Sequence, residues 1–167
     1  MAGNVKAVPQ GYHTITPHLV IKGAEKAIEF YKTAFGAEVK GGVFKTPDGK
    51  VMHAELRIGD STLMLADEFP GMGDCSSPQT LGGSTSALNI YTDNVDQLFE
   101  RATKAGATVT LPLANQFWGD RYGHVKDPFG HVWALGQHVE DVAPEEMQRR
   151  SILIFEQMAK GKGQGAS

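Results

Sequence analysis

The sequence predicts an α+β protein made of two tandem β-α-β-β-β units, followed by a C-terminal helix. Two observations carry this prediction: a strand and helix pattern that occurs twice along the chain, and matched runs of alternating apolar residues after each helix. The chain has 167 residues, of which 41% are apolar, and this suits one compact domain. The expected parts are a first unit over 13–68, a linker loop over 69–84, a second unit over 85–138 and a helical extension over 139–161.

The repeat is clearest in the two predicted helices. The segment 18–39 reads as a short apolar strand and then a helix, and the segment 89–109 repeats this pattern with Val95 standing 71 positions after Ala24. Apolar residues at i, i+3, i+4 and i+7 form one face of a helix, so both sets should be buried at equivalent places. The sets are Ala24, Ala27, Ile28 and Tyr31 in the first helix, and Val95, Leu98, Phe99 and Ala102 in the second.

Each helix is followed by three predicted strands, over 38–68 and over 108–137, with good turn signals between them. In the second unit the last turn is "DPFGHVW", which begins at Asp127. The loop 69–84 is rich in glycine, proline and serine and is expected to be a linker or a lid over a site. A last helix is expected to begin at Pro144 and to end at Gly161. Its apolar positions indicate packing on the body or on a partner chain; they are Met147, Ile152, Phe155 and Met158.

Charge and composition exclude several classes of partner. The 16 basic and 19 acidic residues are dispersed and give a net charge of −3, so we expect no nucleic acid and no anionic membrane as partner. No run approaches the roughly 18 apolar residues that a membrane span requires, and we expect a soluble cytoplasmic protein. Cys75 is the only cysteine, which makes an internal disulfide impossible.

Several segments resemble those of one superfamily. Two tandem β-α-β-β-β units are the pattern of the vicinal oxygen chelate superfamily, which includes glyoxalase I, extradiol dioxygenases and bleomycin-resistance proteins. The motifs "TPHLVIKGAEKAIEFYKTAFGAE", "HAELRIGDSTLMLADE" and "GDRYGHVKDPFGHVW" look like those of its PhnB-like glyoxalase group. The resemblance covers about residues 13–138. It implies curved sheets that form a funnel, a small-molecule ligand on the concave side, and a homodimer that completes or covers its clefts across chains.

The resemblance also implies where a metal would lie. Metal-dependent relatives bind one divalent ion with a side chain from the first and the last strand of each unit. Carried over to this chain, the first-strand positions are Thr16 and Ala87, and the last-strand positions are Ala134 and one near Leu65. Alanine and leucine offer no lone pair and threonine is a poor donor, so we expect no cofactor at the usual metal site.

Alternation along the strands predicts which polar side chains share the funnel with these positions. If the apolar set Met52, Ala54, Leu56 and Ile58 faces the helices, then His53 and Glu55 face the funnel. The same reasoning places Tyr122, His124 and Lys126 on the funnel side, with Trp118, Asp120 and Arg121 at its mouth or wall. The predicted ligand-binding residues are His18, His53, Glu55, Asn89, Trp118, Arg121 and His124, of which Glu55 and His18 are also candidate catalytic residues.

Each of these residues also has a structural interpretation. A half-buried histidine such as His18 often only bonds a neighbour, and Glu55 between two polar residues suits a solvated strand face. Arg121 can hold its turn together through Asp120, although arginine is the usual anchor for a carboxylate or phosphate on a ligand. Trp118 is equally suited to a core.

Three functional classes therefore stay open. The first is a small-molecule binding protein without a metal. The second is a lyase, isomerase or dioxygenase that uses a divalent metal at a displaced site formed by His53, Glu55 and His124, where the ion would act as a Lewis acid. The third is a metal-free enzyme that uses Glu55 and His18 for acid and base chemistry.

Overall fold

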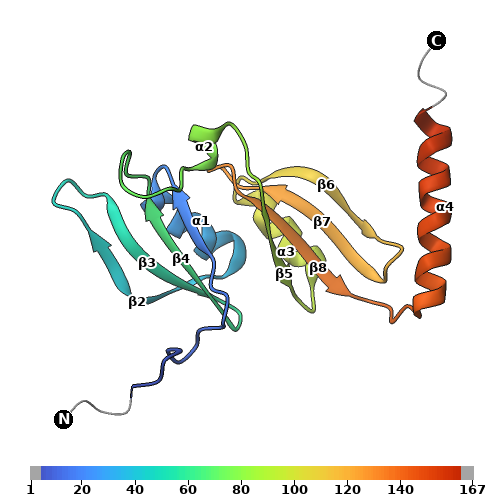
Figure 1. The fold of residues 1–167 in the computed structure, drawn as a ribbon, viewed down its shortest axis with the longest axis horizontal. Coiled ribbons are helices and arrows are strands. Elements are labelled where there is room, and N and C mark those ends of the chain that lie inside the picture. Colours follow the sequence, from blue (N-terminus) through green and yellow to red (C-terminus); the bar gives the residue numbers. More distant parts are fainter. Residues whose placement is uncertain (1–4, 163–167) are drawn as a thin grey trace.

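The computed structural model describes residues 5–162, and the side chains of the last helix up to residue 157. It contains two four-stranded sheets that lie side by side (Figure 1). The first unit consists of β1 (His18–Ile21), α1 (Ala24–Phe35), β2 (Glu38–Lys45), β3 (Val51–Ile58) and β4 (Ser61–Asp67). The connection contains α2 (Pro78–Leu81). The second unit consists of β5 (Ala87–Tyr91), α3 (Val95–Lys104), β6 (Thr108–Asn115), β7 (Asp120–Lys126) and β8 (Val132–His138), and α4 (Pro144–Lys162) follows.

The two units have the same topology, which confirms the predicted fold class. The strand orders are β1-β4-β3-β2 and β5-β8-β7-β6. In each unit the first strand pairs in parallel with the last strand, and the other neighbouring strands are antiparallel. The chain enters each sheet at an edge, crosses over through a helix, and returns as a three-stranded meander. This is the β-α-β-β-β pattern that the repeat predicts.

Each unit ties the start of its helix to the end of its last strand. The Asp67 carboxylate at the end of β4 accepts hydrogen bonds from the backbone N–H groups of Gly23 and Ala24, both at 2.9 Å. At the equivalent place on β8, the Gln137 side chain accepts from the N–H of Val95 at 3.2 Å. The first N–H groups of a helix have no partner within the helix, so these side chains satisfy them and fix each helix on its sheet.

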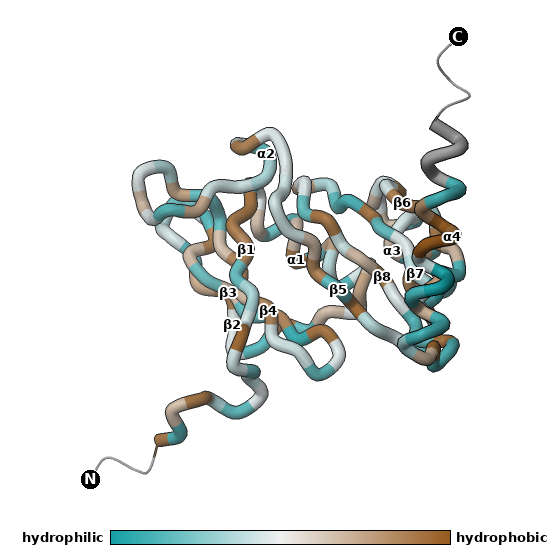
Figure 2. The backbone as a smooth tube through the Cα atoms, turned by 45° about the vertical axis from the view of Figure 1, so that its right-hand side comes forward, coloured by the Kyte–Doolittle hydropathy of each residue, from teal (hydrophilic) through white to brown (hydrophobic). Residues whose placement is uncertain are grey.

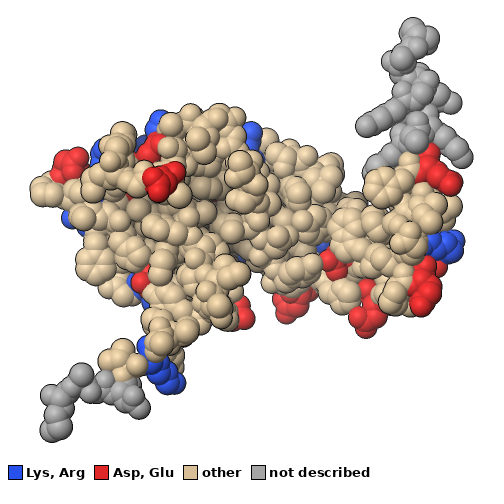
Figure 3. All heavy atoms as spheres, viewed as in Figure 1, with Lys and Arg blue, Asp and Glu red and all other residues tan. Residues whose placement is uncertain are grey.

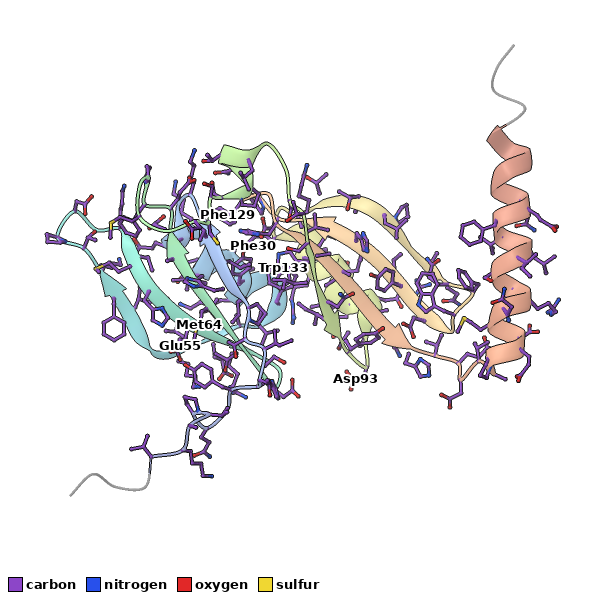
Figure 4. The ribbon with its side chains drawn as sticks, in the orientation of Figure 1. Phe30, Glu55, Met64, Asp93, Phe129 and Trp133 are labelled. Carbon is purple, nitrogen blue, oxygen red and sulfur yellow. The ribbon has the colours of Figure 1, made fainter. Side chains whose placement is uncertain are left out.

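The core lies between the sheets and the two helices, which also pack on each other. All four predicted apolar positions of α1 are buried, and three of the four in α3 are buried. The exception is Phe99, which is half-buried, and its ring packs over Gly123 of β7, where a Cβ would lie 2.9 Å from it. Five aromatic rings from both units gather at the junction of the units, as Figure 4 shows for three of them; they are Phe30, Tyr31, Phe35, Phe129 and Trp133.

One predicted core position was wrong. Met52 is 55% exposed, whereas its neighbour Val51 is fully buried. The pairing of β2 with β3 shifts register between Phe44 and Lys45, opposite Met52. An extra residue in one strand reverses the alternation beyond it, so Val51 takes the inward position that strict alternation assigns to Met52.

The helix α4 points away from the two units (Figure 1). Its base is held by Arg150, whose guanidinium donates to the Glu140 carboxylate at 2.7 and 2.8 Å. Two of the residues expected to pack, Ile152 and Phe155, are 48% and 69% exposed in the single chain, and Figure 2 colours this part of the helix hydrophobic. The Met158 side chain lies outside the described residues. Among the helices of residues 5–162, none is long and apolar enough to span a membrane.

Candidate functional site

Each sheet has one face against its helix and one face turned away from it, and the polar residues lie on the second kind of face. In β1 the buried Leu19 and Ile21 point to the core, so His18 points outward. In β7, Val125 is buried and Gly123 contacts α3, so Tyr122 and His124 point outward. We call these surfaces the first face, with His18, Lys40, His53, Glu55 and Met64, and the second face, with Asn89, Asp120, Tyr122, His124 and Ala134.

The first face brings together three of the predicted residues. The Glu55 carboxylate lies 3.3 Å from the Nε2 atom of His53 and 4.0 Å from the ammonium of Lys40. The rings of His18 and His53 meet edge to face, with centroids 6.4 Å apart. These contacts form a small polar cluster on the first face, and Figure 4 shows that Glu55 and Met64 lie on this sheet away from the aromatic junction of the units.

The electrostatics of this cluster favour an ionised Glu55. A hydrogen bond from the Tyr12 hydroxyl is the largest cause that lowers the pKa of Glu55, and His53 and Lys40 lower it further against the opposing effect of burial. The pKa of His18 is also lowered, first by burial and then by the neighbouring His53. At neutral pH the cluster therefore favours a carboxylate at Glu55, and His18, whose ring meets that of His53, resists protonation.

The second face is organised by Tyr122. Its hydroxyl donates to the Oδ1 atom of Asn89 at 3.2 Å, and the Nε2 atom of His124 lies 3.0 Å from the same hydroxyl. A His124 ring that carries its proton on Nε2 completes this chain of hydrogen bonds. The rings of Trp118 and Tyr122 pack edge to face at 5.5 Å, and the rings of Tyr122 and His124 do so at 5.1 Å. Tyr122 thus joins three predicted residues, Asn89, Trp118 and His124, into one cluster.

Arg121 does not share this face. Its Nε and Nη2 atoms donate to the two carboxylate oxygens of Asp96 in α3, at 2.8 and 2.5 Å. Successive side chains on a strand point to opposite sides, so Arg121 lies on the helix side while its neighbours Asp120 and Tyr122 lie on the second face. The structure therefore places the expected anion anchor away from Asn89 and His124.

The donor set does not fit the divalent ion of metal-dependent relatives. Thr16 donates its hydroxyl to the His13 carbonyl at 3.2 Å, and Ala87 and Ala134 have no donor atom. The register pairs His18 with Met64 and Asn89 with Ala134, so the counterpart of Ala134 is Met64, whereas Leu65 is fully buried in the core. A thioether and a hydroxyl are poor ligands for such an ion.

The displaced set is divided between the units. His53 and Glu55 lie on the first sheet, and His124 lies on the second sheet. Within residues 5–162, side chains of histidine, cysteine, aspartate and glutamate form no group of three or more that could hold a metal ion. A site built from these three residues would require the first face, with His53 and Glu55, to lie opposite a second face that carries His124.

A cavity of about 480 Å³ lies between the units, at the free edge of β5. Its walls come from the N-terminal segment, from the turn between β3 and β4, and from both sides of β5. Asn89 and Tyr91 reach it from the second unit, and Thr62 reaches it from the first. The cavity therefore adjoins one end of the second face.

Comparison with known proteins agrees with this architecture. Residues 12–135 match the family model of the glyoxalase/bleomycin resistance protein/dioxygenase superfamily. The uncharacterized protein Rv0887c of Mycobacterium tuberculosis is 48% identical over 136 residues, which are 80% of this chain and 79% of that protein.

Two solved structures are similar in fold. TnmS3, described as an antibiotic binding protein from Streptomyces sp. CB03234, is 26% identical with a TM-score of 0.57, and the match covers 80% of this chain and 99% of that one. The PhnB protein from Bacillus cereus is 20% identical with a TM-score of 0.59, over 75% of this chain and 99% of that one.

Proposed function

The chain belongs to the glyoxalase/bleomycin resistance protein/dioxygenase superfamily, and from this premise we propose that it binds a small polar or aromatic molecule on the outward faces of its sheets. The observation that carries the proposal is the cluster around Tyr122. Small-molecule sites combine aromatic surface with a few polar groups whose positions are fixed. Trp118 and Tyr122 supply aromatic surface, and Asn89 and His124 supply polar groups held by hydrogen bonds to the Tyr122 hydroxyl.

Two further observations support a binding role. The side of the molecule seen in Figure 3 has few charged atoms over its middle, so an uncharged ring system would displace water there at little electrostatic cost. TnmS3, which is similar to this chain, is described as an antibiotic binding protein. A ligand with an aromatic part and polar substituents fits both observations.

We infer that a second copy of the chain completes the site. β1 pairs only with β4 and β5 pairs only with β8, so each sheet has a free edge at its first strand. Within one chain the units pack through α1 and α3, which leaves the first and second faces apart. A homodimer that joins free edges across chains would make a funnel in which His53 and Glu55 of one copy face Asn89 and His124 of the other.

The contact between His53 and Glu55 favours one alternative function. These side chains lie 3.3 Å apart on one strand face, and with His124 from a second copy they would supply three ligands to a divalent ion. The protein would then be a metal-dependent lyase, isomerase or dioxygenase. Elemental analysis of dimeric protein purified without chelators separates the two functions, because a stoichiometric divalent metal that is lost in His53→Gln supports the enzyme.

The binding proposal is tested by titrating the protein with 4-nitroanisole, a neutral aromatic molecule, and following the quenching of tryptophan fluorescence. The Trp118 part of the emission should be quenched, because the other tryptophan, Trp133, is buried in the core. Tyr122→Leu should weaken the affinity about tenfold because it removes ring contact, whereas Tyr122→Phe should weaken it less. Glu29→Gln, on the exposed surface of α1 and away from both faces, is the matched control for changes elsewhere. Unchanged affinity in a folded Tyr122→Leu variant would contradict a site on the second face.

A further inference from the structure

Asp120 lies at the end of the second face, beneath three side chains that all contact its carboxylate. The Tyr91 hydroxyl donates to its Oδ2 atom at 2.7 Å, and the indole N–H of Trp118 donates to the same oxygen at 3.1 Å. The Nδ1 atom of His138 lies 2.8 Å from the other oxygen. Asp120 itself is only 5% exposed, so its negative charge is held by these partners rather than by water.

The Asp120 carboxylate fixes the orientation of His138, whose Nδ1 atom faces it while the Nε2 atom points outward, 3.0 Å from the carboxylate of Asp141. Both contacts are hydrogen bonds when the imidazole carries a proton on each nitrogen. Asp141 is fully exposed, and a surface ion pair of this kind is weak because water screens it. A ligand oxyanion that is also held by ring contacts can displace Asp141 and take the Nε2 contact.

Aromatic surface surrounds this imidazole. Tyr91 is 62% exposed, and its ring and that of Tyr122 lie on either side of Gly136, where a Cβ would come within 3.2 and 3.3 Å of them. Trp118 packs edge to face on Tyr122. Because Tyr91, Trp118 and His138 converge on one carboxylate, a planar ligand that lies against the rings has its substituents next to the Nε2 atom of His138.

We propose that this end of the second face binds aromatic molecules with an acidic hydroxyl, such as phenols and naphthols, and holds them as oxyanions against His138. When the imidazole is neutral, the ligand O–H bond breaks, the electron pair stays on oxygen, and the proton forms the Nε2–H bond. The products are a phenolate and an imidazolium that Asp120 stabilises through Nδ1–H. No other reactant is needed, and the proton returns to oxygen when the ligand leaves.

The charged groups around His138 are consistent with this assignment. Asp141 and Asp120 both raise the pKa of His138 and favour its protonated form, and burial opposes them. The pKa of Tyr91 is raised, first by its hydrogen bond to Asp120, so it stays a neutral donor. Glu140, two positions after His138, is paired with Arg150. A bound oxyanion would therefore contact one cation, the His138 imidazolium. Asp141 is the main group that competes with it for that contact.

This inference rests on the proposed binding of aromatic molecules and adds the chemistry of the ligand. The test compares 4-nitrophenol, whose yellow phenolate absorbs apart from its neutral form, with 4-nitroanisole, which has no acidic hydrogen. Bound to the full-length protein, 4-nitrophenol should show its pKa lowered by about one unit, which corresponds to about 1.4 kcal/mol. It should also bind more tightly than 4-nitroanisole at neutral pH.

Two variants make the test specific. His138→Gln keeps a polar side chain but cannot become a cation, so the pKa shift should disappear while 4-nitroanisole still binds. Asp141→Asn removes the competing carboxylate, so 4-nitrophenol should bind several-fold more tightly, which a purely structural role for His138 does not predict.

The outcomes separate this inference from the proposed function. Binding of both probes with no pKa shift overturns the inference and leaves the aromatic site standing. Failure of both probes to bind the folded protein overturns both. If the pKa shift of 4-nitrophenol persists in His138→Gln, another group of the protein stabilises the oxyanion, and this result also overturns the inference.

Discussion

The hydroxyl of Tyr31 in the first unit donates to the carboxylate of Asp127 in the second unit at 2.7 Å, and both side chains are buried. The Asp127 carboxylate also accepts from the Trp133 indole at 2.9 Å and from the backbone N–H groups of Phe129 and His131, both at 2.9 Å. The turn "DPFGHVW" thus folds around a buried carboxylate that is satisfied by neutral donors. Its role is to join the units.

Tyr31→Phe should destabilise the protein by about 1.5 to 3 kcal/mol, because it removes a buried hydrogen bond to a charged group. Urea denaturation measures this loss as a lower midpoint. Tyr91→Phe is the matched control, since that ring is 62% exposed and its stability cost should be smaller. Equal losses in the two variants would contradict a special role for the Tyr31 contact.

The wild-type protein should also lose stability in alkali through Tyr31. Burial and the charge of Asp127 raise the pKa of Tyr31 well above its ordinary value of 10.0. The folded state therefore keeps the phenol protonated at a pH where the unfolded chain releases its proton, and stability falls as the pH rises above about 10. Tyr31→Phe should show a flatter decline over this range, and parallel curves for both proteins would exclude the effect.

His131 should make stability fall in mild acid. Burial is the largest cause that lowers the pKa of His131 below 6.5, and its Nε2 atom is the one buried side-chain polar atom in the described residues without a hydrogen-bond partner. The unfolded chain therefore binds a proton that the folded protein resists, so stability is lost as the pH falls below 6.5. His131→Gln should remove this dependence between about pH 5 and 6.5, as measured by thermal denaturation. His13→Gln, at an exposed position, should leave it unchanged.

Arg150 should hold α4 against the second unit. Its guanidinium bonds Glu140 and Glu146 and donates to the Phe117 carbonyl at 3.4 Å. Arg150→Gln should expose the segment 139–143 to limited proteolysis while the melting temperature of the two units changes little, because exposed ion pairs are screened by water and contribute little to global stability. Ser151→Ala serves as the comparison. Equal cleavage of all three proteins would show that these contacts do not fix the helix.

Acid should loosen α4 itself. Two arginines of the same helix, first Arg149 and then Arg150, lower the pKa of Glu146 from 4.5 to about 2. A carboxylate with a lowered pKa stabilises the folded arrangement above the unfolded value, and this contribution is lost as the pH falls from 4.5 toward 2. Hydrogen exchange of α4 amides should therefore quicken over this range, and Glu146→Gln should already show the faster exchange at neutral pH.

Gly136→Ala should disturb the second face more than the core. The new Cβ would lie 3.2 Å from Tyr91 and 3.3 Å from Tyr122, so both rings must move by a few tenths of an ångström. We expect a several-fold loss of 4-nitroanisole affinity with a stability change of about 1 kcal/mol. Gly49→Ala is a control for stability alone, because its Cβ would meet no atom although its φ of 87° strains the backbone. Full affinity in Gly136→Ala would show that the rings do not set the site.

The sequence by itself determined the fold and much of the two faces. A repeated helix pattern and alternation of period two are local properties of the chain, and they predict two equivalent units with Asn89, His124, His53 and Glu55 on outward faces. The same local reasoning failed where one residue changes the register. Met52 lies opposite a register shift, and a single-residue difference between the units makes Met64 the counterpart of Ala134 in place of Leu65.

Only the tertiary structure decided which of these side chains meet. Arg121 finds its partner Asp96 on α3, and Tyr122 links Asn89 to His124 across three strands. Asp120 gathers Tyr91 and His138, which are 29 and 18 positions away in the chain, together with its near neighbour Trp118. Periodicity fixes the face on which a residue lies, whereas the partners of a buried carboxylate depend on strand order and register, which arise from long-range packing. For this reason the pairing of Asp120 with His138 could not be predicted from the order of residues alone.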